Sequence, residues 1–420
     1  MSPARLSTVF PGGVNIAATE NLRRPRRFFT LFRGMKMHDG SQPIRFETST
    51  AEVSVHRIVA ELPAETRRHA LACELKDFRY YAISAETLAA QFEHRFLVLK
   101  NKQSGQTAVQ PVFVADQDLL DGLPEKYARI IASPRKIFPR WLKARMLFAG
   151  ASAGTGALDC TAPWAVTAFS EALEKLAREK KCAMILLKDF SAKFRTALQP
   201  LADSKKFRRV PSMPACVLDF DFKTFEEYMS NTLGRKLRYK YLKLNKQPAI
   251  PFEIVADVTA IADELHALYL ATHNRSKMRF EKLTPEFFAR VGREMPDRAK
   301  YFIWRVEGKI VAFALCFVND GVMDHLNIGF DYAVAFDLQL YYVTIRDIFR
   351  WCLANGVKRY ETGQLNYDPK FHLQMKLLPL DLYARHTSPL INPLLHRALG
   401  FLQPTKHEKL LKEFPNFNEL

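Results

Sequence analysis

The chain has 420 residues, of which 48% are hydrophobic and 25% are charged, and this composition supports packed cores and excludes wholesale disorder. Lysine and arginine outnumber aspartate and glutamate by 62 to 44, which gives a formal net charge of +18. At about 100–200 residues per domain, the length predicts two or three domains. The positive charge favours polyanionic partners, namely nucleic acid, anionic lipid head groups or phosphorylated cofactors, with solubility alone as the alternative.

The cysteines and the apolar segments indicate the compartment. None of the six cysteines forms a CxxC pair, so we expect free thiols in a reducing compartment, with no disulfide framework and no metal site. We expect no secretory signal, because no apolar run follows the first basic residue, and no stretch reaches the ~18 uncharged apolar residues of a membrane span. The expected location is cytoplasmic, either soluble or peripheral on the inner face of the membrane.

Residues 1–45 form a basic leader. Arginines at positions 23, 24, 26 and 27 are followed directly by the aromatic segment 28–32. Basic residues beside aromatic residues are typical of an interfacial membrane anchor and equally of an RNA-contacting arm. A basic tail without a partner is the third interpretation, and all three stay open.

Residues 46–205 are expected to form a first α/β domain. Apolar periodicity and turn residues predict, in chain order, a helix, a hairpin, a strand, a loop of small residues, a helix and a closing strand at 63–75, 96–100 with 109–114, 145–150, 151–156, 163–181 and 183–187. The loop that runs from Gly150 to Gly156 is suited to phosphate binding, but it lacks the Lys-Ser/Thr of a nucleotide loop. Kinase or NTPase chemistry is therefore not expected, and a substrate-lining or vestigial role is the interpretation.

A second domain, residues 215–387, repeats this order after a basic connector at 201–214. The expected elements are a strongly basic helix, two further helices, a hairpin, a strand, a long helix ended by Gly356 and a closing strand, at 225–244, 260–272, 285–293, 301–306 with 310–318, 322–332, 338–354 and 359–362. Residues 388–420 form an amphipathic, basic C-terminal tail. Such a tail either lies on a membrane or packs against the protein's own core.

The repeated order of elements resembles the GNAT acyltransferase fold, and its doubling resembles the tandem arrangement of Fem-type peptidyltransferases. Three segments of the second half carry this likeness: the basic stretch 228–238, the run from Gly329 to Gly356, and Gly363-Gln364-Leu365-Asn366-Tyr367 with a lysine after it. The resemblance implies an α/β (α+β) protein of two tandem GNAT-like domains, each with a mixed central sheet flanked by helices. It covers residues 215–385 well and 50–200 loosely.

One segment departs from the pattern of simple GNAT enzymes. These carry a Q/R-x-x-G-x-G/A loop before the third helix, whereas this chain has Ala333-Val334-Ala335-Phe336-Asp337-Leu338. The missing glycines put a standard acetyl-CoA grip in doubt, although the Fem-like group often lacks them too.

Acyl transfer to an amine needs a held acyl group, a base for the ammonium proton and stabilisation of the oxyanion. His325 beside Asp324 on the strand 322–328 is the first candidate base, because a histidine next to a carboxylate takes up a proton near neutral pH. Glu361 on the next strand is an equal second, and Tyr367 is the candidate acid for the leaving thiolate. The alternative for each residue is packing in the core.

The donor is expected at the start of the helix that follows residue 337. Unpaired backbone N–H groups there attract a pyrophosphate, so Asp337, Leu338 and Gln339 are the candidate site for acyl-CoA, with Asp337 as the expected N-cap. Lys370 and Lys376 are candidates to neutralise its phosphates. The polar stretch 273–280 supplies candidate substrate contacts, which are His273, Arg275 and Arg279.

Three functions are carried forward. The first is an acyl-CoA-dependent N-acyltransferase of lipid metabolism that acts on an amphipathic amine, such as a sphingoid base, as in a bacterial ceramide synthase. The second is a Fem-type transferase that uses aminoacyl-tRNA, which the net charge of +18 favours. The third is a GNAT-like protein that binds without catalysis. The sequence gives neither the acceptor nor the oligomeric state.

Overall fold

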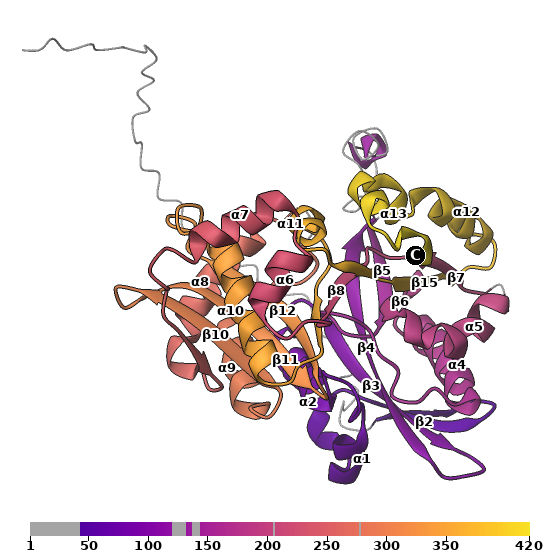
Figure 1. The fold of residues 1–420 in the computed structure, drawn as a ribbon. Helices are drawn as coiled ribbons and strands as arrows, with labels where there is room; N and C mark the ends of the chain where they lie inside the picture. Colours follow the sequence, from indigo (N-terminus) through magenta and orange to yellow (C-terminus); the bar gives the residue numbers. More distant parts are fainter. Residues whose placement is uncertain (1–42, 120–131, 137–142, 205, 277–278) are drawn as a thin grey trace, which may run out of the picture. The chain divides into compact units, whose positions relative to one another are not determined.

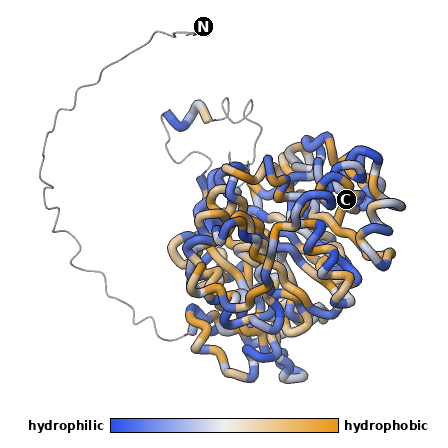
Figure 2. Tube along the Cα trace, turned by 60° about the vertical axis from the view of Figure 1, so that its left-hand side comes forward, coloured by the Kyte–Doolittle hydropathy of each residue, from blue (hydrophilic) through white to orange (hydrophobic). Residues whose placement is uncertain are grey.

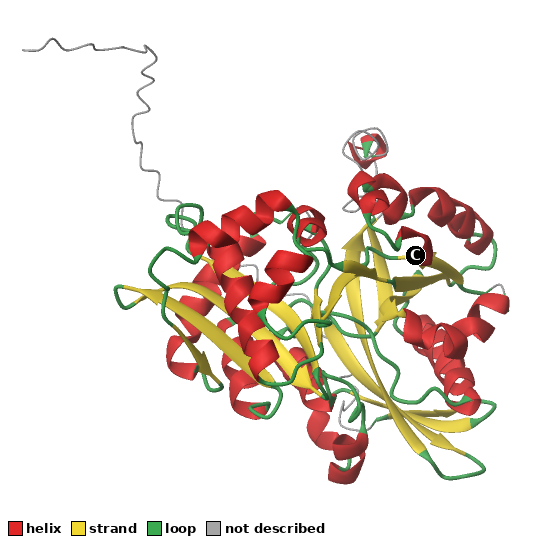
Figure 3. Ribbon diagram, viewed as in Figure 1, coloured by secondary structure: helices red, strands yellow, loops and turns green. Residues whose placement is uncertain are grey.

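The computed structural model describes residues 43–420 except 120–131, 137–142, 205 and 277–278, and omits the side chains of residues 402 and 404. The expectations for the basic leader therefore lie outside the described residues. Residues 43–420 form one compact unit. Two mixed β-sheets with helices on their faces make up this unit, which is the architecture expected from the sequence (Figure 3).

The first sheet has eight strands in the order β1-β2-β3-β4-β5-β6-β15-β7 (Figure 1). All neighbouring strands are antiparallel except β5 and β6, which are parallel. Their bounds are β1 Ile44–Glu47, β2 Ala51–His56, β3 Glu93–Asn101, β4 Thr107–Asp118, β5 Lys143–Ala149, β6 Met184–Ser191, β7 Arg208–Pro211 and β15 Leu380–His386.

The second sheet has seven strands in the order β14-β8-β13-β12-β11-β10-β9. Again one neighbouring pair is parallel, β12 with β13, and the long helix α10 connects the two strands. Their bounds are β8 Ala215–Asp219, β9 Phe252–Val255, β10 Ala299–Val306, β11 Lys309–Asn319, β12 Val322–Phe330, β13 Arg359–Thr362 and β14 Lys376–Leu378.

Helices cover both faces of each sheet. Helix α4 packs on the first sheet, while α8 and α10 lie on opposite faces of the second. The α-helices are α1 Ala64–His69, α2 Phe78–Thr87, α4 Pro163–Glu179, α5 Arg195–Asp203, α6 Phe225–Asn231, α7 Arg235–Leu244, α8 Ala262–His273, α9 Pro285–Glu294, α10 Leu340–Ala354, α11 Tyr367–His372, α12 Asn392–Leu402 and α13 Pro404–His407. The 3₁₀ turns are η1 Val59–Glu61, η2 Ser133–Lys136, η3 Ala192–Phe194, η4 Thr259–Ile261, η5 Lys409–Glu413 and η6 Phe417–Glu419.

Several helix boundaries follow from local chemistry. The side chains of Asp77, Thr224 and Thr284 accept hydrogen bonds from the first-turn N–H groups of α2, α6 and α9, as N-caps do. Helix α10 ends at the left-handed Gly356, as expected. The expected helix 225–244 is wrong as a single element, because residues 232–234 separate α6 from α7.

The hydrophobic core joins the two halves of the chain. One cluster of buried side chains contains the first sheet together with α8, α9 and the face of the second sheet beneath them. A second cluster lies between the other face of that sheet and α6, α7 and α10. Figure 2 shows apolar segments running through the interior. All six cysteines are free, and four of them are buried. In the part of the chain that the structure describes, no helix is both long and apolar enough to cross a bilayer.

Strand β15 crosses between the halves. It lies in residues 215–387, the range expected for the second domain, yet it pairs with β6 and β7 in the first sheet. Its Asp381 is fully buried, and its carboxylate pairs with Arg195 at 2.7 Å and with Arg209 at 3.2 Å. This pairing could not be predicted from the sequence, because a short buried strand carries no local pattern that identifies the sheet it joins.

Replacement of Asp381 by alanine should destabilise the protein by about 2 kcal/mol or more, because two guanidinium groups lose a buried partner. Both arginines are about one-third exposed, so the loss should be smaller than for a fully buried pair. Urea unfolding followed by circular dichroism measures this difference. The matched change at exposed Asp203, D203A, should stay within about 0.5 kcal/mol of wild type. Equal stability of D381A and D203A would contradict the role given to this ion cluster.

Candidate active site

A cleft opens where β12 and β13 part. The two strands pair in parallel over four residues, from Val322 with Arg359 to His325 with Thr362. Strand β13 then ends, whereas β12 continues beside β11 to Phe330. The space between them is a cavity of about 620 Å³. It is lined by the β12 residues His325, Leu326, Asn327 and Ile328, where β12 is bulged against β11. Residues of α8 and of α10, which cover opposite faces of the sheet, also line it, so the cleft involves both faces.

The turn after β13 holds the cleft open. Leu365 and Asn366 have φ angles of 68° and 51°, a left-handed conformation that is unfavourable for leucine. The ammonium group of Lys370 donates hydrogen bonds to the carbonyl oxygens of Gly363 at 2.5 Å and of Leu365 at 2.8 Å. Lys370 is buried and also lines the cleft. The lysine therefore ties the start of α11 to the turn that ends β13.

Burial lowers the pKa of Lys370 to about 8. The cause is loss of hydration of the ammonium group, since neither of its hydrogen-bond partners is a carboxylate. Lys370 was expected to neutralise phosphates of the donor, but its depth places the charge beside the centre of the cleft. Lys376, the other expected phosphate partner, is exposed at the start of β14 and does not line the cleft.

His325 lies in the wall of the cleft and is 6% exposed. Its Nδ1 is 2.6 Å from the hydroxyl oxygen of Tyr360, and its buried Nε2 has no hydrogen-bond partner. Burial lowers the pKa of His325 to about 4; the charge of Asp324 opposes this shift and that of Lys370 adds to it. The imidazole is thus neutral at physiological pH, with one nitrogen free for a ligand.

Two other buried polar atoms of the cleft wall lack partners. They are Oδ1 of Asn327, two residues along β12 from His325, and Oγ1 of Thr272 at the end of α8. Unpaired buried polar atoms are costly, so three of them in one cavity indicate a ligand-binding site.

Asp324 does not pair with His325, and the expected histidine–carboxylate dyad is wrong. Neighbouring residues of a strand point to opposite faces, and the Asp324 carboxylate faces the first half of the chain, where Lys76 Nζ lies 2.5 Å away. Both side chains are largely buried, with 7% of Lys76 and 16% of Asp324 exposed. The ion pair therefore links the second sheet to the segment between α1 and α2.

Glu361 lies beside this ion pair. It is the register partner of Asp324 on β13, and its carboxylate accepts a hydrogen bond from Arg359 Nε at 2.9 Å. Burial and the charge of Asp324 raise the pKa of Glu361, while Arg359 and Lys76 act in the opposite direction. Glu361 is not among the residues that line the cleft, but it precedes by one residue the point where the strands part.

Tyr367, the expected acid, lines the cleft but is otherwise engaged. Its hydroxyl group donates a hydrogen bond to the carbonyl oxygen of Pro214 at 2.8 Å. Burial raises its pKa well above the ordinary value. This arrangement disfavours the phenol as a proton donor to a thiolate.

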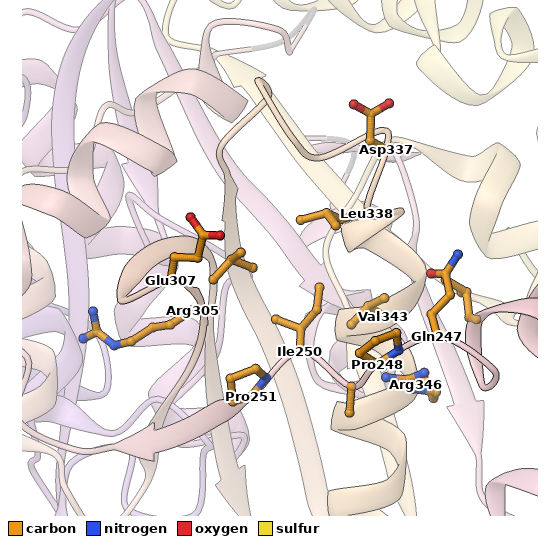
Figure 4. A pocket seen from close by; sticks show the side chains of 13 residues that line it. Gln247, Pro248, Ile250, Pro251, Arg305, Glu307, Asp337, Leu338, Val343 and Arg346 are labelled. Carbon is orange, nitrogen blue, oxygen red and sulfur yellow. The ribbon is translucent and has the colours of Figure 1, made fainter.

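The expected donor residues lie elsewhere. Helix α10 begins at Leu340 with Gln339 as its N-cap, so Asp337 is not the cap. Asp337 and Leu338 line a separate cavity of about 460 Å³ (Figure 4). The N–H groups of Leu338, Gln339 and Leu340 already donate to backbone carbonyls of the same segment, which leaves little of the expected anion cradle.

Of the three residues expected to contact the substrate, one lines the cleft and two do not. Arg275 lines the cleft with its guanidinium 4.1 Å above the ring of Tyr332. His273 is turned to the carbonyl oxygen of Glu281 at 3.0 Å, and Arg279 is exposed; neither lines the cleft. The small-residue loop 150–156 is packed against Lys76 and Leu326 at Gly154, so it is no open phosphate cradle.

Sequence reasoning missed two groups of site residues. Tyr360 shares a face with His325 and was recoverable from the two-residue period of strands. Asn327 was not recoverable, because a bulge at Leu326 in β12 turns it to the opposite face from His325. Lys76 was not recoverable, because it lies 248 residues from Asp324 and has no motif around it. Tail residues Glu408 and Leu410, which also line the cleft, were missed for the same reason.

The low pKa of His325 predicts a pH-dependent stability. Between pH 6.5 and about 4 the unfolded chain takes up a proton that the folded imidazole does not, so wild type should lose up to about 3 kcal/mol as pH falls through this window. The H325Q variant lacks this titrating group, so its free energy of unfolding should fall less over the same pH range. Urea unfolding of both proteins at pH 7, 6 and 5 gives the comparison. Parallel pH profiles of wild type and H325Q would rule out the buried neutral histidine.

Comparisons with known proteins agree with this geometry. Residues 233–370 match the family model described as an acetyltransferase (GNAT) domain, and no curated protein sequence matches the chain. Among solved structures, FemX is similar with a TM-score of 0.50 and 11% identity over 76% of this chain and 93% of that one.

Two further solved structures are similar at a lower level. The C-terminal domain of a putative lysylphosphatidylglycerol synthetase from Agrobacterium fabrum has a TM-score of 0.47 and 14% identity, covering 80% of this chain and 96% of that one. A tandem GNAT protein from the clavulanic acid biosynthesis pathway has a TM-score of 0.41 and 12% identity, covering 80% and 99%. At 11% sequence identity, the similarity to FemX shows only that the fold is shared. The chain therefore has a tandem GNAT-like fold with a GNAT acetyltransferase domain in its second half, and its class of activity is N-acyl transfer.

Proposed function

We propose that this protein transfers an acyl group from an acyl-CoA-type thioester to the amine of an amphipathic acceptor, in the cleft between β12 and β13. The observation that supports this most is the cleft itself, which passes between parted parallel strands and carries three buried polar atoms without partners. A donor and an acceptor can meet there from opposite faces of the sheet. Backbone groups freed by the parting of the strands hold the acyl group in line.

Glu361 is the general base in this proposal and, because it lies one residue outside the wall of the cleft, it takes the proton through a water molecule. An attacking amine must lose a proton, and a carboxylate whose pKa is raised by burial is a better acceptor than an exposed one. His325 was an equal candidate, but with a pKa of about 4 its imidazole takes up a proton poorly at neutral pH.

His325 instead stabilises the oxyanion. If the hydroxyl group of Tyr360 donates to Nδ1, the neutral ring carries its proton on Nε2, which is buried without a hydrogen-bond partner in a residue that lines the cleft. A neutral N–H donor in a buried site stabilises the developing negative charge on the thioester oxygen.

The amine nitrogen forms a bond to the carbonyl carbon, and the carbon–sulfur bond breaks. The proton of the amine passes to Glu361, and the CoA thiolate leaves beside the buried positive charge of Lys370, which stabilises it. The thiolate then takes up a proton from solvent and Glu361 releases its own, so the products are an amide and a free thiol and the base is regenerated.

An amphipathic acceptor fits two features of the structure. Tyr332, Tyr341 and Ile345 give the cleft an aromatic and apolar side. Helix α12 of the C-terminal tail packs Leu395 against the core but leaves Leu394 and Phe401 67% and 65% exposed. The tail thus packs on the protein and keeps an apolar outer face for a lipid surface. The comparisons give no support to a ceramide-synthase-like identity, so the acceptor is proposed only as a class.

The proposed roles predict that wild type releases thiol from acyl-CoA in the presence of a long-chain amine, and that E361Q and H325N each lower kcat by about 10²-fold or more. Thiol release across a panel of acyl-chain lengths, with the amide identified by mass spectrometry, measures this. E413Q, an exposed change in the tail, is the control and should keep full activity.

The same thiol-release assay, run beside an assay with aminoacyl-tRNA, distinguishes an acyl-CoA donor from an aminoacyl-tRNA donor. Turnover of aminoacyl-tRNA without turnover of any acyl-CoA would replace the proposed thioester donor with the Fem-type donor. Full activity of E361Q would remove Glu361 as the base.

Lys76 should set the pH dependence of this activity although it lies in the first half of the chain. Its charge lowers the pKa of Glu361, and a base works only when deprotonated, so activity rises with pH through that pKa. Lys76→Met should therefore move the rising limb of kcat/KM to higher pH, and Lys76→Arg should restore it. The control is Lys193→Met, which breaks an exposed ion pair with Glu74. A limb that stays in place in Lys76→Met would contradict the coupling.

A further inference from the structure

Helix α7 presents a basic and apolar face to solvent. At 100° per residue, the exposed positions Arg235, Lys236, Tyr239, Leu242 and Lys243 fall on one side of the helix, and exposed Lys246 continues it by one turn. Leu237, Tyr241 and Leu244 on the opposite side are buried in the second core. We call these six exposed residues the α7 face.

The cations of this face lack acidic partners. Among the residues that the structure describes, no ion pair involves a side chain of α7 or Lys246, although the chain forms many ion pairs elsewhere. Lys243 Nζ instead lies 4.9 Å from the ring centre of exposed Tyr239. Four lysine and arginine charges thus stand together without compensation, an arrangement that invites an anionic partner.

Large apolar side chains are exposed with these charges. Tyr239 is 61% exposed and Leu242 is 45% exposed. The end of α7 also borders the cavity of about 460 Å³ shown in Figure 4, whose wall includes Leu244, Ile250 and Leu338. Two residues before Leu338 in sequence, Phe336 is 71% exposed. Charge and apolar surface therefore occur on the same part of the second half.

We propose that the α7 face docks on a bilayer that contains anionic phospholipid. The charged ends of the lysine and arginine side chains would contact the lipid phosphates. Tyr239 and Leu242 would enter the boundary between the lipid head groups and the acyl chains.

The apolar residues distinguish a bilayer from RNA. A phosphate backbone is matched by cations alone, and an exposed leucine between them would stay hydrated at a cost. In a bilayer the same leucine is buried in the interface, so both kinds of side chain contribute. Helix α12 offers an apolar outer face with Arg397 as its one exposed cation, which makes α7 the electrostatic contact.

This inference deepens the proposed function, because it names the surface at which the protein would meet an amphipathic acceptor. The biological purpose of docking rests on the proposed function, whereas the docking itself does not. Vesicle binding needs neither donor nor acceptor. Loss of docking with intact transfer to a short water-soluble amine would leave the proposed function standing.

Vesicle co-sedimentation tests the proposal. The full chain should bind vesicles in which phosphatidylglycerol replaces part of the phosphatidylcholine, bind pure phosphatidylcholine weakly, and lose affinity as salt rises from about 0.1 M to about 0.5 M. K236E/K243E should lower the affinity about tenfold or more. Y239S/L242S should lower it while the salt dependence remains.

The matched control is K100E/K358E, which makes the same change of net charge at exposed lysines outside the α7 face. It should bind as wild type does. The proposal is overturned if wild type ignores anionic vesicles, if the control loses as much affinity, or if L394S on α12 abolishes binding and both α7 variants keep it. It is also overturned if the α7 variants lose affinity for bulk tRNA but not for vesicles.

Discussion

The site depends on one constraint, which is that β12 and β13 cannot stay paired beyond His325 and Thr362. Strand β13 ends in a turn with two left-handed residues, and buried Lys370 holds that turn through two carbonyl oxygens. Because β12 continues without a parallel partner, a cleft opens and its wall exposes polar atoms that the sheet does not satisfy. One lysine thus supports the shape of the site and places a positive charge in it.

The first half of the chain takes part in the site without lining the cleft. Lys76 neutralises Asp324, the register partner of Glu361, and so couples the environment of the proposed base to the packing between the halves. Strand β15 and its buried Asp381 join the halves again from the other end of the chain. Under the proposed function, one GNAT-like half therefore tunes the pKa of the base that the other half carries.

Much of the fold was predictable, because the hairpins and the long helices between strands leave periodic patterns and turn or cap residues in the sequence. The exchange of β15 was not, since pairing between distant strands leaves no local signal. In the site, His325 was expected to act beside the carboxylate of Asp324, but neighbouring strand residues point to opposite faces, and Asp324 pairs with Lys76 instead. Asp337 was misplaced as an N-cap, because the turns before α10 delay the helix to Leu340. Contacts such as Lys76 with Asp324 arise only from tertiary packing.

The most direct test of the central claim is a crystal structure of the protein with a non-hydrolysable acyl-CoA analogue. The account predicts the acyl carbonyl between β12 and β13, with its oxygen within hydrogen-bond distance of His325 Nε2 and the sulfur on the side of Lys370. An analogue bound elsewhere, with the cleft still empty, would contradict the account.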